Sequence, residues 1–427
     1  MYGYDVQSHL TYFMLLDELY LSKDPRWTPV NAQTAPVGDT LQQTIKLSRA
    51  STSATDIPLL LTNLTLEFNS PTTYIRLRNI NNNNNNELEG DITSPNNNEV
   101  ETTEKEEEEK HLLRSIPSGS IIRNAISGYQ LMIDKFNLTR NLAKSKYLVP
   151  TMLIERGRIT QSFQVDHFQQ ETAMVTSRES VPIVWFLKDP LKNRGEGIEL
   201  FHSVDESLKH CLPNKRYILQ REIIPMLFNS FKFDVRINIA LVFNSDETKL
   251  YIYNEGIMRC TGTKYVSGSV EKGEQFTNFC FQQKLNPSFG NIVPLADWDT
   301  DGSRLATMEQ AVGEIFDLFL PRLNQLRHSG VTVFGLDFIF DSDGHPYLLE
   351  INNSPSMFVH SNERVASICR RAIAQLPALA FEPLLEGATP IAKDWKLLRD
   401  YTNRHRCTNT DSNDDGQSED FNLFDDL

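Results

Sequence analysis

The chain lacks any apolar run that approaches the roughly 20 residues of a membrane-spanning helix. The apolar stretch at residues 10–21 is interrupted by Asp17 and Glu18 and has no basic leader, so we expect neither a signal peptide nor a membrane anchor. Cysteine is also sparse, with five residues in 427 and no CxxC spacing, which favours reduced thiols in the cytosol over a disulfide or zinc framework. We find no persuasive Ser-His-Asp or Cys-His arrangement either, so the sequence offers no obvious covalent nucleophile.

Acidic residues outnumber basic ones, and the excess lies in two segments. Of the net charge of −14, residues 81–110 carry −8 and residues 407–427 carry −7, which leaves the rest of the chain at +1. The first segment contains six consecutive asparagines and four consecutive glutamates. Such polar tracts bury too little apolar surface to become ordered. We therefore predict a disordered Asn/Glu-rich insertion over residues 81–110 and an acidic disordered tail over residues 401–427.

The remaining composition is typical of a globular protein, since the chain is 40% apolar and 23% charged and is long enough for two or three domains. We predict an N-terminal α/β domain over residues 1–80, a central domain over residues 111–216 and a C-terminal domain over residues 217–400. Within the first, apolar spacing predicts a helix over residues 10–21 and one or two strands over residues 57–68. Helical spacing recurs in three later segments, residues 120–146, 303–328 and 365–376.

The most informative stretch is residues 331–355, VTVFGLDFIFDSDGHPYLLEINNSP. Two apolar runs of strand length flank Asp343-Gly344, a dipeptide typical of hairpin turns whose two central residues have φ > 0. A two-residue turn there places Asp337 directly opposite Glu350, with Asn352 on the same face. The residues predicted to point to the other, apolar face are Leu336, Phe338, Phe340, Tyr347, Leu349 and Ile351.

Two directly opposed carboxylates repel each other, and a cation between them removes that cost. Asp337, Glu350 and Asn352 form an oxygen-only set that suits Mg²⁺, which binds carboxylates together with the phosphates of a substrate. Alternatively, both acids could be solvated residues on the outer face of a half-buried sheet. We favour the metal site.

Basic residues and glycines upstream could contact an anion. A predicted strand ends at Lys188, and the loop after it carries Lys192, Arg194 and Gly195-Glu-Gly197. Glycine lets backbone amides approach a phosphate closely, and lysine adds a point charge, although a plain hairpin loop would have the same pattern. Bases within residues 123–158 also cluster enough to predict an anion-facing surface.

The strand predicted over residues 231–243 alternates strictly between polar and apolar residues. Lys232, Asp234, Arg236 and Asn238 share one face, and we interpret them as ligand contacts rather than as a surface ion-pair ladder. Neighbouring strands are predicted over residues 217–224 and 249–259, the second of which ends at Arg259.

Taken in order, the segments WFLK, RGEGI, YILQREI, KFDVR, NEGIMR, TN, GLDF and LLEINNSP resemble the tubulin tyrosine ligase and ligase-like family. The resemblance covers about residues 120–380. It implies an α+β fold of the ATP-grasp type, in which a small N-terminal domain precedes central and C-terminal domains whose antiparallel sheets enclose the nucleotide.

The resemblance also implies roles for individual residues. The expected contacts to ATP are Lys135, Lys188, Arg194, Gln220, Arg221, Glu222, Ile223, Asp234, Thr277 and Asn278. Lys232, Arg236 and Arg259 would contact the incoming substrate and the transferred phosphate, and Asp337, Glu350 and Asn352 would bind Mg²⁺.

The implied reaction is amide-bond formation. A protein carboxylate attacks the γ-phosphate of ATP to form an acylphosphate, and the amine of an amino acid then displaces phosphate. The expected partners are a free amino acid and the acidic C-terminal tail of tubulin, with no nucleic acid or membrane. We expect a monomer that is located in the cytoplasm and associated with the cytoskeleton, for example in cilia or at basal bodies.

Two features separate this chain from parts of the family. Gln275-Phe276 stands where the family often has His-Leu before Thr-Asn. The residues after Glu350 resemble chain-initiating or elongating members, whereas the compact length resembles tyrosine ligase itself, so tyrosine, glutamate and glycine all stay open. The alternatives are an ATP-grasp ligase with a non-tubulin substrate and a catalytically silent cytoskeletal adaptor.

Overall fold

The computed structural model describes residues 2–5, 27–30, 60–62, 121–123, 126, 128–164, 182–192, 195–244, 247–286, 290–323, 329–353, 355 and 362–401. The helix predicted over residues 10–21, the insertion over residues 81–110, the tail beyond Tyr401 and Arg194 lie outside these residues. Of the strands predicted over residues 57–68, the described part contains β3 (Leu60–Thr62).

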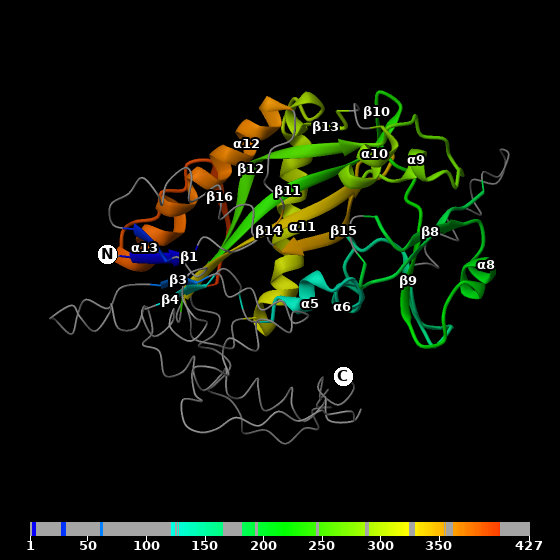
Figure 1. Cartoon of the computed structure of the whole chain (residues 1–427), viewed down its shortest axis with the longest axis horizontal. Coiled ribbons are helices and arrows are strands. Elements are labelled where there is room, and N and C mark those ends of the chain that lie inside the picture. The colour runs from blue at the N-terminus through cyan, green and yellow to red at the C-terminus, as the bar shows by residue number, and fades with distance from the viewer. Residues whose placement is uncertain are drawn as a thin grey trace, which may run out of the picture.

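In the described part of the chain, eleven strands form one large sheet in the order β13-β12-β11-β14-β4-β3-β1-β2, with β10 also paired to β11, β15 to β14 and β16 to β12 (Figure 1). Its centre is antiparallel and consists of β11 (Phe231–Phe243), β12 (Thr248–Cys260), β14 (Ser329–Phe340) and β15 (Pro346–Asn353). The short antiparallel strands are β10 (Leu227–Phe228), β13 (Ile292–Pro294) and β16 (Trp395–Asp400). The parallel extension is formed by β1 (Tyr2–Asp5), β2 (Trp27–Val30), β3 and β4 (Ile121–Arg123).

A second, smaller sheet lies beside the end of the large one, at the right of Figure 1. Its order is β6-β5-β9-β7-β8, and every pairing is antiparallel. The strands are β5 (Thr151–Glu155), β6 (Arg158–Phe163), β7 (Trp185–Lys188), β8 (Ile198–Phe201) and β9 (Arg216–Arg221), and α8 (Val204–Lys209) packs against them. Because β9 begins at residue 216, the end of the predicted central domain, and pairs with β5 and β7, the chain returns from the small sheet to the large one only after β9. The predicted domain boundaries themselves stay predictions.

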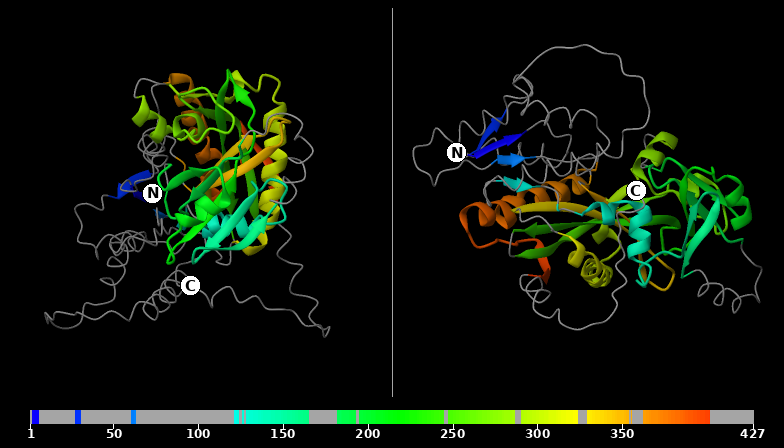
Figure 2. Two further views of the ribbon diagram at one scale, coloured as in Figure 1. Left: turned by 90° about the vertical axis from the view of Figure 1, so that its right-hand side faces the viewer. Right: turned by 90° about the horizontal axis from the view of Figure 1, so that it is seen from below.

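Helices cover the two faces of the large sheet unequally (Figure 2). On one face, α11 (Ser303–Phe319) packs its buried side chains, such as Phe316, against the apolar row of β11 that includes Val235 and Ile237. On the other face, α12 (Glu363–Ala374) and the π-helical η4 (Pro377–Phe381) cover Ala240 and Val242. The same face of β11 continues as Asn238, Arg236, Asp234 and Lys232, beyond this helical cover. The part of that face that α12 and η4 leave uncovered is the place for a site.

The fold is therefore α+β with antiparallel sheets, as predicted. One helix prediction was wrong in extent. Within residues 120–146, Ile121–Arg123 forms β4, because its backbone pairs with β3 and β14, and the helices are α5 (Gln130–Ile133) and α6 (Lys135–Asn141). Asp134 separates them and caps α6 by accepting a hydrogen bond from the backbone of Asn137 at 2.8 Å.

Short helices complete the described chain. They are α9 (Lys272–Gln275), α10 (Phe279–Leu285), η2 (Leu295–Asp297), η3 (Leu320–Arg322) and α13 (Glu382–Glu386). The helix predicted over residues 303–328 ends as α11 at Phe319 and continues into η3. Among the described residues, no helix combines the length and the apolar character needed to cross a membrane.

Candidate active site

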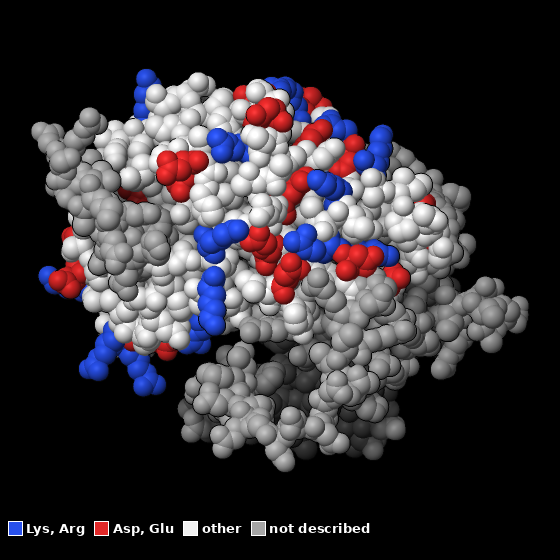
Figure 3. All heavy atoms as spheres, turned by 180° about the vertical axis from the view of Figure 1, so that it is seen from behind, with Lys and Arg blue, Asp and Glu red and all other residues white. Residues whose placement is uncertain are grey.

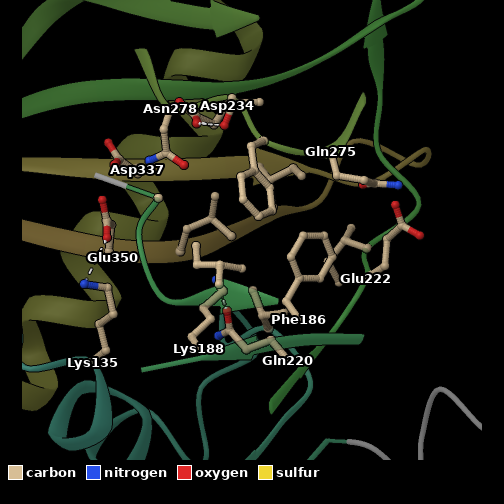
Figure 4. Close-up of a pocket in the computed structure, with 18 of the residues that line it drawn as sticks. Lys135, Phe186, Lys188, Gln220, Glu222, Asp234, Gln275, Asn278, Asp337 and Glu350 are labelled. Carbon is tan, nitrogen blue, oxygen red and sulfur yellow. Dashed lines mark hydrogen bonds and ion pairs between the residues drawn. The ribbon is translucent and has the colours of Figure 1, made fainter. Parts of the chain in front are cut away.

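A pocket opens between the two sheets, and most of the predicted site residues line it (Figure 4). One part of its wall is apolar, with Val149, Phe186, Ile198, Ile223, Ile339 and Leu349. The predicted residues that line the pocket are Lys135, Lys188, Gln220, Arg221, Glu222, Ile223, Lys232, Asp234, Arg259, Thr277, Asn278, Asp337 and Glu350. An apolar slot next to convergent charges suits a ligand with a flat ring at one end and anionic groups at the other.

Arg236 and Asn352 lie directly beside the pocket lining. Arg236 donates to the Asp337 carboxylate through two nitrogens, Nε to Oδ1 and Nη2 to Oδ2, the second at 2.9 Å. Asn352 Nδ2 donates to Glu350 Oε1 at 3.1 Å and to Asp337 Oδ2 at 3.3 Å. Arg194 cannot be placed because it lies outside the described residues, but Lys192 and Gly195 on either side of it line the pocket.

Two buried carboxylates and two arginines form a continuous ionic network across β12, β11 and β14. Arg259 Nε donates to Asp234 Oδ1 at 2.6 Å, and its Nη2 lies 2.7 Å from Asp337 Oδ2. Asp337 is only 1% exposed. Burial by itself would raise the pKa of Asp337, but the charges of Arg236 and Arg259 outweigh it and hold that pKa below the usual range of a carboxyl group. Asp337 is therefore ionised and shared between the two guanidinium groups.

The proposed metal ligands meet at one point, as their predicted register requires. Asp337 pairs with Glu350, and Gly335 pairs with Asn352. The amide of Asn352 contacts both carboxylates, so the three side chains converge on one small volume with two carboxylates and an amide. The described residues contain no group of three or more His, Cys, Asp or Glu side chains placed to hold a metal. This donor set fits Mg²⁺, which takes few protein carboxylates and completes its shell with water and phosphate.

The hairpin that carries these ligands has a longer turn than predicted. Five residues, Asp341–His345, connect the strands, and the Asp341 side chain accepts hydrogen bonds from the backbone amides of Asp343 and His345 at 3.0 and 2.7 Å. Phe340 pairs with Pro346, and a β-bulge after Phe338–Leu348 restores the pairing of Asp337 with Glu350. The bulge compensates for the longer turn, so the predicted pair is correct although the predicted turn is wrong.

The same bulge corrects the predicted faces of β15. Leu336, Phe338, Phe340 and Ile351 pack in the core under the sheet, as predicted. Tyr347 and Leu349 do not, because they pack with Val149, Ile223 and Ile339 on the pocket side, while Leu348 takes the core position. Leu349 thus lines the pocket next to Glu350.

Two lysines approach the pocket, Lys188 from β7 of the small sheet and Lys135 from the start of α6. Lys188 Nζ donates to Gln220 Oε1, and burial lowers the pKa of Lys188 to about 8. Lys135 Nζ lies 3.5 Å from Glu350 Oε2 and 3.4 Å from the backbone oxygen of Lys192 (Figure 4). These ammonium groups surround the place where anionic groups of a ligand would lie.

Comparison with known proteins identifies the family of this chain. The sequence model of the Tubulin-tyrosine ligase family matches residues 123–299 and 309–384. The chain belongs to this family.

Similar members differ in the reaction for which they are named. The chain is 26% identical over 290 residues to Tubulin polyglutamylase TTLL5 of Homo sapiens, covering 58% of this chain and 21% of the relative. It is 24% identical over 268 residues to Tubulin glycylase 3B of Drosophila melanogaster, covering 57% of this chain and 34% of the relative. It is 26% identical over 211 residues to Tubulin monoglutamylase TTLL4 of Mus musculus, covering 42% of this chain and 17% of the relative. The matches thus span about a third or less of each relative's own length.

Within the Tubulin-tyrosine ligase family, the Gln275 departure has a defined structural consequence. Gln275 is buried, accepts a hydrogen bond from Lys232 Nζ at 2.6 Å and donates to the backbone oxygen of Ser269 at 2.8 Å. Lys232 also lies 3.3 Å from Glu222 Oε1 and 5.0 Å from the centre of the Phe186 ring. The glutamine therefore holds Lys232 in place without adding a titratable group.

Several residues of the site were not predicted from the sequence, and Phe186, Gln275 and Gly335 show why. Phe186 lies two residues before Lys188 on one strand, so the alternation that placed Lys188 could also have placed Phe186 in the pocket. Gln275 was noted from the sequence only as a departure from the family pattern, and no contact was predicted for it. Gly335 was missed because its role is close contact: a Cβ there would lie 2.7 Å from Pro355 Cβ and 2.9 Å from Arg236 Cδ. The absence of a side chain at Gly335 lets Arg236 lie flat against β14 and reach Asp337.

Proposed function

We propose that this chain is an ATP- and Mg²⁺-dependent ligase of the ATP-grasp type that joins an amino acid to a carboxylate of a protein. The observation that carries the proposal is the convergence, in one pocket between two antiparallel sheets, of Lys135, Lys188, Arg259 and the set formed by Asp337, Glu350 and Asn352. Phosphoryl transfer requires mainly positioning and neutralisation of charge, which these side chains supply.

The proposed reaction has two steps. An acceptor carboxylate oxygen attacks the γ-phosphorus of ATP, ADP leaves, and an acylphosphate forms. The amine of the amino acid then attacks the acyl carbon, the C–O bond to phosphate breaks, and an amide and inorganic phosphate result. Mg²⁺, when bound by Asp337, Glu350 and Asn352, would neutralise charge on the phosphates.

The protein side chains have separate tasks in this scheme. The apolar wall of Phe186, Ile223 and Leu349 would hold the adenine ring, and Lys135 and Lys188 would bind the phosphates. Arg236 and Arg259 are at present paired with Asp337 and Asp234. Because both arginines lie beside the proposed metal ligands, we assign them to the anionic groups of the substrate and of the transferred phosphate.

We propose tubulin as the acceptor protein, since the relatives are named as a tubulin polyglutamylase, a tubulin glycylase and a tubulin monoglutamylase. An acidic tubulin tail is an extended chain of carboxylates and suits a site rich in lysine and arginine. A location in the cytoplasm with the cytoskeleton follows from that substrate.

The test is mass spectrometry of tubulin tails after incubation with the protein, ATP, Mg²⁺ and each of glutamate, glycine and tyrosine in turn. We expect a mass increment with one of the three that disappears without ATP. No increment with any of them would contradict the tubulin-ligase proposal, and ATP-dependent modification of a different protein would assign another acceptor.

A further inference from the structure

A group of arginines surrounds one glutamate on the small sheet, away from the pocket. In the strand register, Glu155 of β5 lies directly opposite Arg158 of β6 on one side and Arg216 of β9 on the other. Directly opposed residues share a face of a sheet, so both guanidinium groups lie on the side of Glu155. Arg140 of α6 reaches the same carboxylate, Nη2 to Oε1 at 3.1 Å. One carboxylate thus faces three arginines.

An aromatic ring beneath these arginines holds two of them in place. The guanidinium carbons of Arg140 and Arg216 lie 4.9 and 5.0 Å from the centre of the Phe136 ring, which is fully buried. A planar guanidinium over an aromatic ring keeps its outward N–H donors free for a carboxylate. Phe136 therefore preorganises this surface.

The tip of the β5–β6 hairpin adds a fourth arginine in an unusual conformation. Arg156 and Gly157 form the two-residue turn, with φ of 52° and 70°. Turns of this type favour Asn or Gly at the first position, because other side chains disfavour the left-handed region. Arg156 is exposed and makes no ion pair within the described residues. A residue that goes against the conformational preference of its position, and makes no contact that stabilises the fold in exchange, is typical of a functional position.

The charge of this cluster is largely uncompensated. Glu155 pairs with Arg140, whereas Arg156, Arg158 and Arg216 make no ion pair within the described part of the chain. The face of the molecule in Figure 3 carries acidic and basic side chains side by side, so an excess of one sign is not general to the surface. Strand β6 is also an edge of the small sheet, and its outer backbone edge pairs with no described strand. An open edge is a template for an extended chain.

We propose that Arg140, Arg156, Arg158 and Arg216, the arginine cluster, dock an extended acidic segment of a protein partner beside the edge of β6. The cluster and the pocket lie along one face of β9, where Arg216, Ile218 and Gln220 alternate and Ile218 packs with Phe136. Gln220 follows Arg216 by four positions along the strand, which is about 13 Å. If the proposed function holds, acidic side chains that flank the modified carboxylate bind the arginine cluster while that carboxylate enters the pocket.

The test measures binding without catalysis, by fluorescence anisotropy of a labelled oligoglutamate peptide with the full chain and no nucleotide. We expect Arg156→Asn to weaken binding by about two- to fivefold, and Arg158→Gln with Arg216→Gln to weaken it further. Because Asn suits the left-handed turn, Arg156→Asn should keep or raise the melting temperature, which separates lost binding from lost folding. Lys393→Gln, which removes an exposed base with no ion pair among the described residues, is the matched control and should bind as the unchanged protein does.

Several outcomes would overturn the inference. Binding unchanged in Arg156→Asn and in the double variant would do so, as would tighter binding of an oligonucleotide than of the peptide. Tighter peptide binding after neutralisation of the seven acids in residues 407–427 would make the chain's own tail the occupant. A chain that ligates nothing yet binds the peptide through Arg156 would overturn the proposed function alone, and tubulin ligation with no effect of these arginines on binding would overturn the docking surface alone.

Discussion

Lys188 is a residue whose burial has a consequence for pH. Its pKa is lowered to about 8, so the side chain is charged at neutral pH and loses its proton as the pH rises through that value. A triphosphate prefers the charged form, so nucleotide affinity should fall by up to about tenfold per pH unit above this pKa. Isothermal titration calorimetry from neutral pH upward measures the slope. Lys188→Arg, which stays charged, should flatten it, and an equal slope in both proteins would contradict the role of Lys188.

The two carboxylates of the proposed metal site should respond differently to loss of charge. Asp337→Asn leaves Arg236 and Arg259 buried with too little negative charge, which costs about 3–5 kcal/mol of unfolding free energy. Glu350 and its partner Lys135 are 23% and 17% exposed, so Glu350→Gln should cost about 1 kcal/mol or less while abolishing ATP turnover. Chemical denaturation and a phosphate-release assay measure the two effects. Unchanged turnover in Glu350→Gln would remove the metal assignment.

Acid should have a matching effect on the unchanged protein. Because the folded-state pKa of Asp337 lies below its unfolded value of about 3.9, the stability that its ionised form contributes is present above that value and is lost as the pH falls. The Asp337→Asn variant should lack this part of the acid dependence.

The sequence identified most of these residues but not their partners. Alternation along β11 placed Lys232, Asp234 and Arg236 on one face without any structure. The ion pairs formed by Asp234 with Arg259 and by Arg236 with Asp337 join directly opposed positions on neighbouring strands. They could be predicted only if the order β12-β11-β14 were known, and that order depends on contacts between residues far apart in the chain.

The β14–β15 hairpin shows which local rules suffice and which do not. Asp343-Gly344 correctly marked a turn, and period-two alternation correctly placed Phe338 in the core. The bulge has no sequence signal that we recognise, and it moves Leu349 from the core side to the pocket side. Pairing register near a bulge depends on what the two strands pack against.

Two substitutions in this hairpin compare its core-facing side with its pocket-facing side. Phe338→Ala removes a fully buried ring behind the site and should cost about 3–5 kcal/mol of unfolding free energy. Leu349→Ala removes a half-buried side chain from the pocket wall, so it should cost less stability and instead weaken nucleotide binding. Denaturant titration and calorimetry separate the effects. Equal losses of stability would place Leu349 in the core, as the two-residue turn had predicted.

At the scale of the whole molecule, the site occurs where one face of the large sheet changes character. On that face of β11, Ala240 and Val242 are covered by α12 and η4, whereas Lys232, Asp234 and Arg236 face the pocket and the small sheet. Neither sheet alone makes the pocket, since Phe186 and Gln220 come from one and Asp337 and Leu349 from the other. Alternation along one strand cannot show that a second sheet closes the site.

A ligand shared by two sheets should therefore stabilise both together. ATP with Mg²⁺ at about 100 times its Kd should add about 2.7 kcal/mol of unfolding free energy and slow amide hydrogen exchange in β7 and β9 as well as in β11 and β15. Exchange in η4, which lies outside the pocket, should change least. A chelator should remove most of the effect if Asp337, Glu350 and Asn352 hold the cation. Slower exchange confined to one sheet, or equal protection with the chelator present, would contradict a nucleotide and metal site formed between the two.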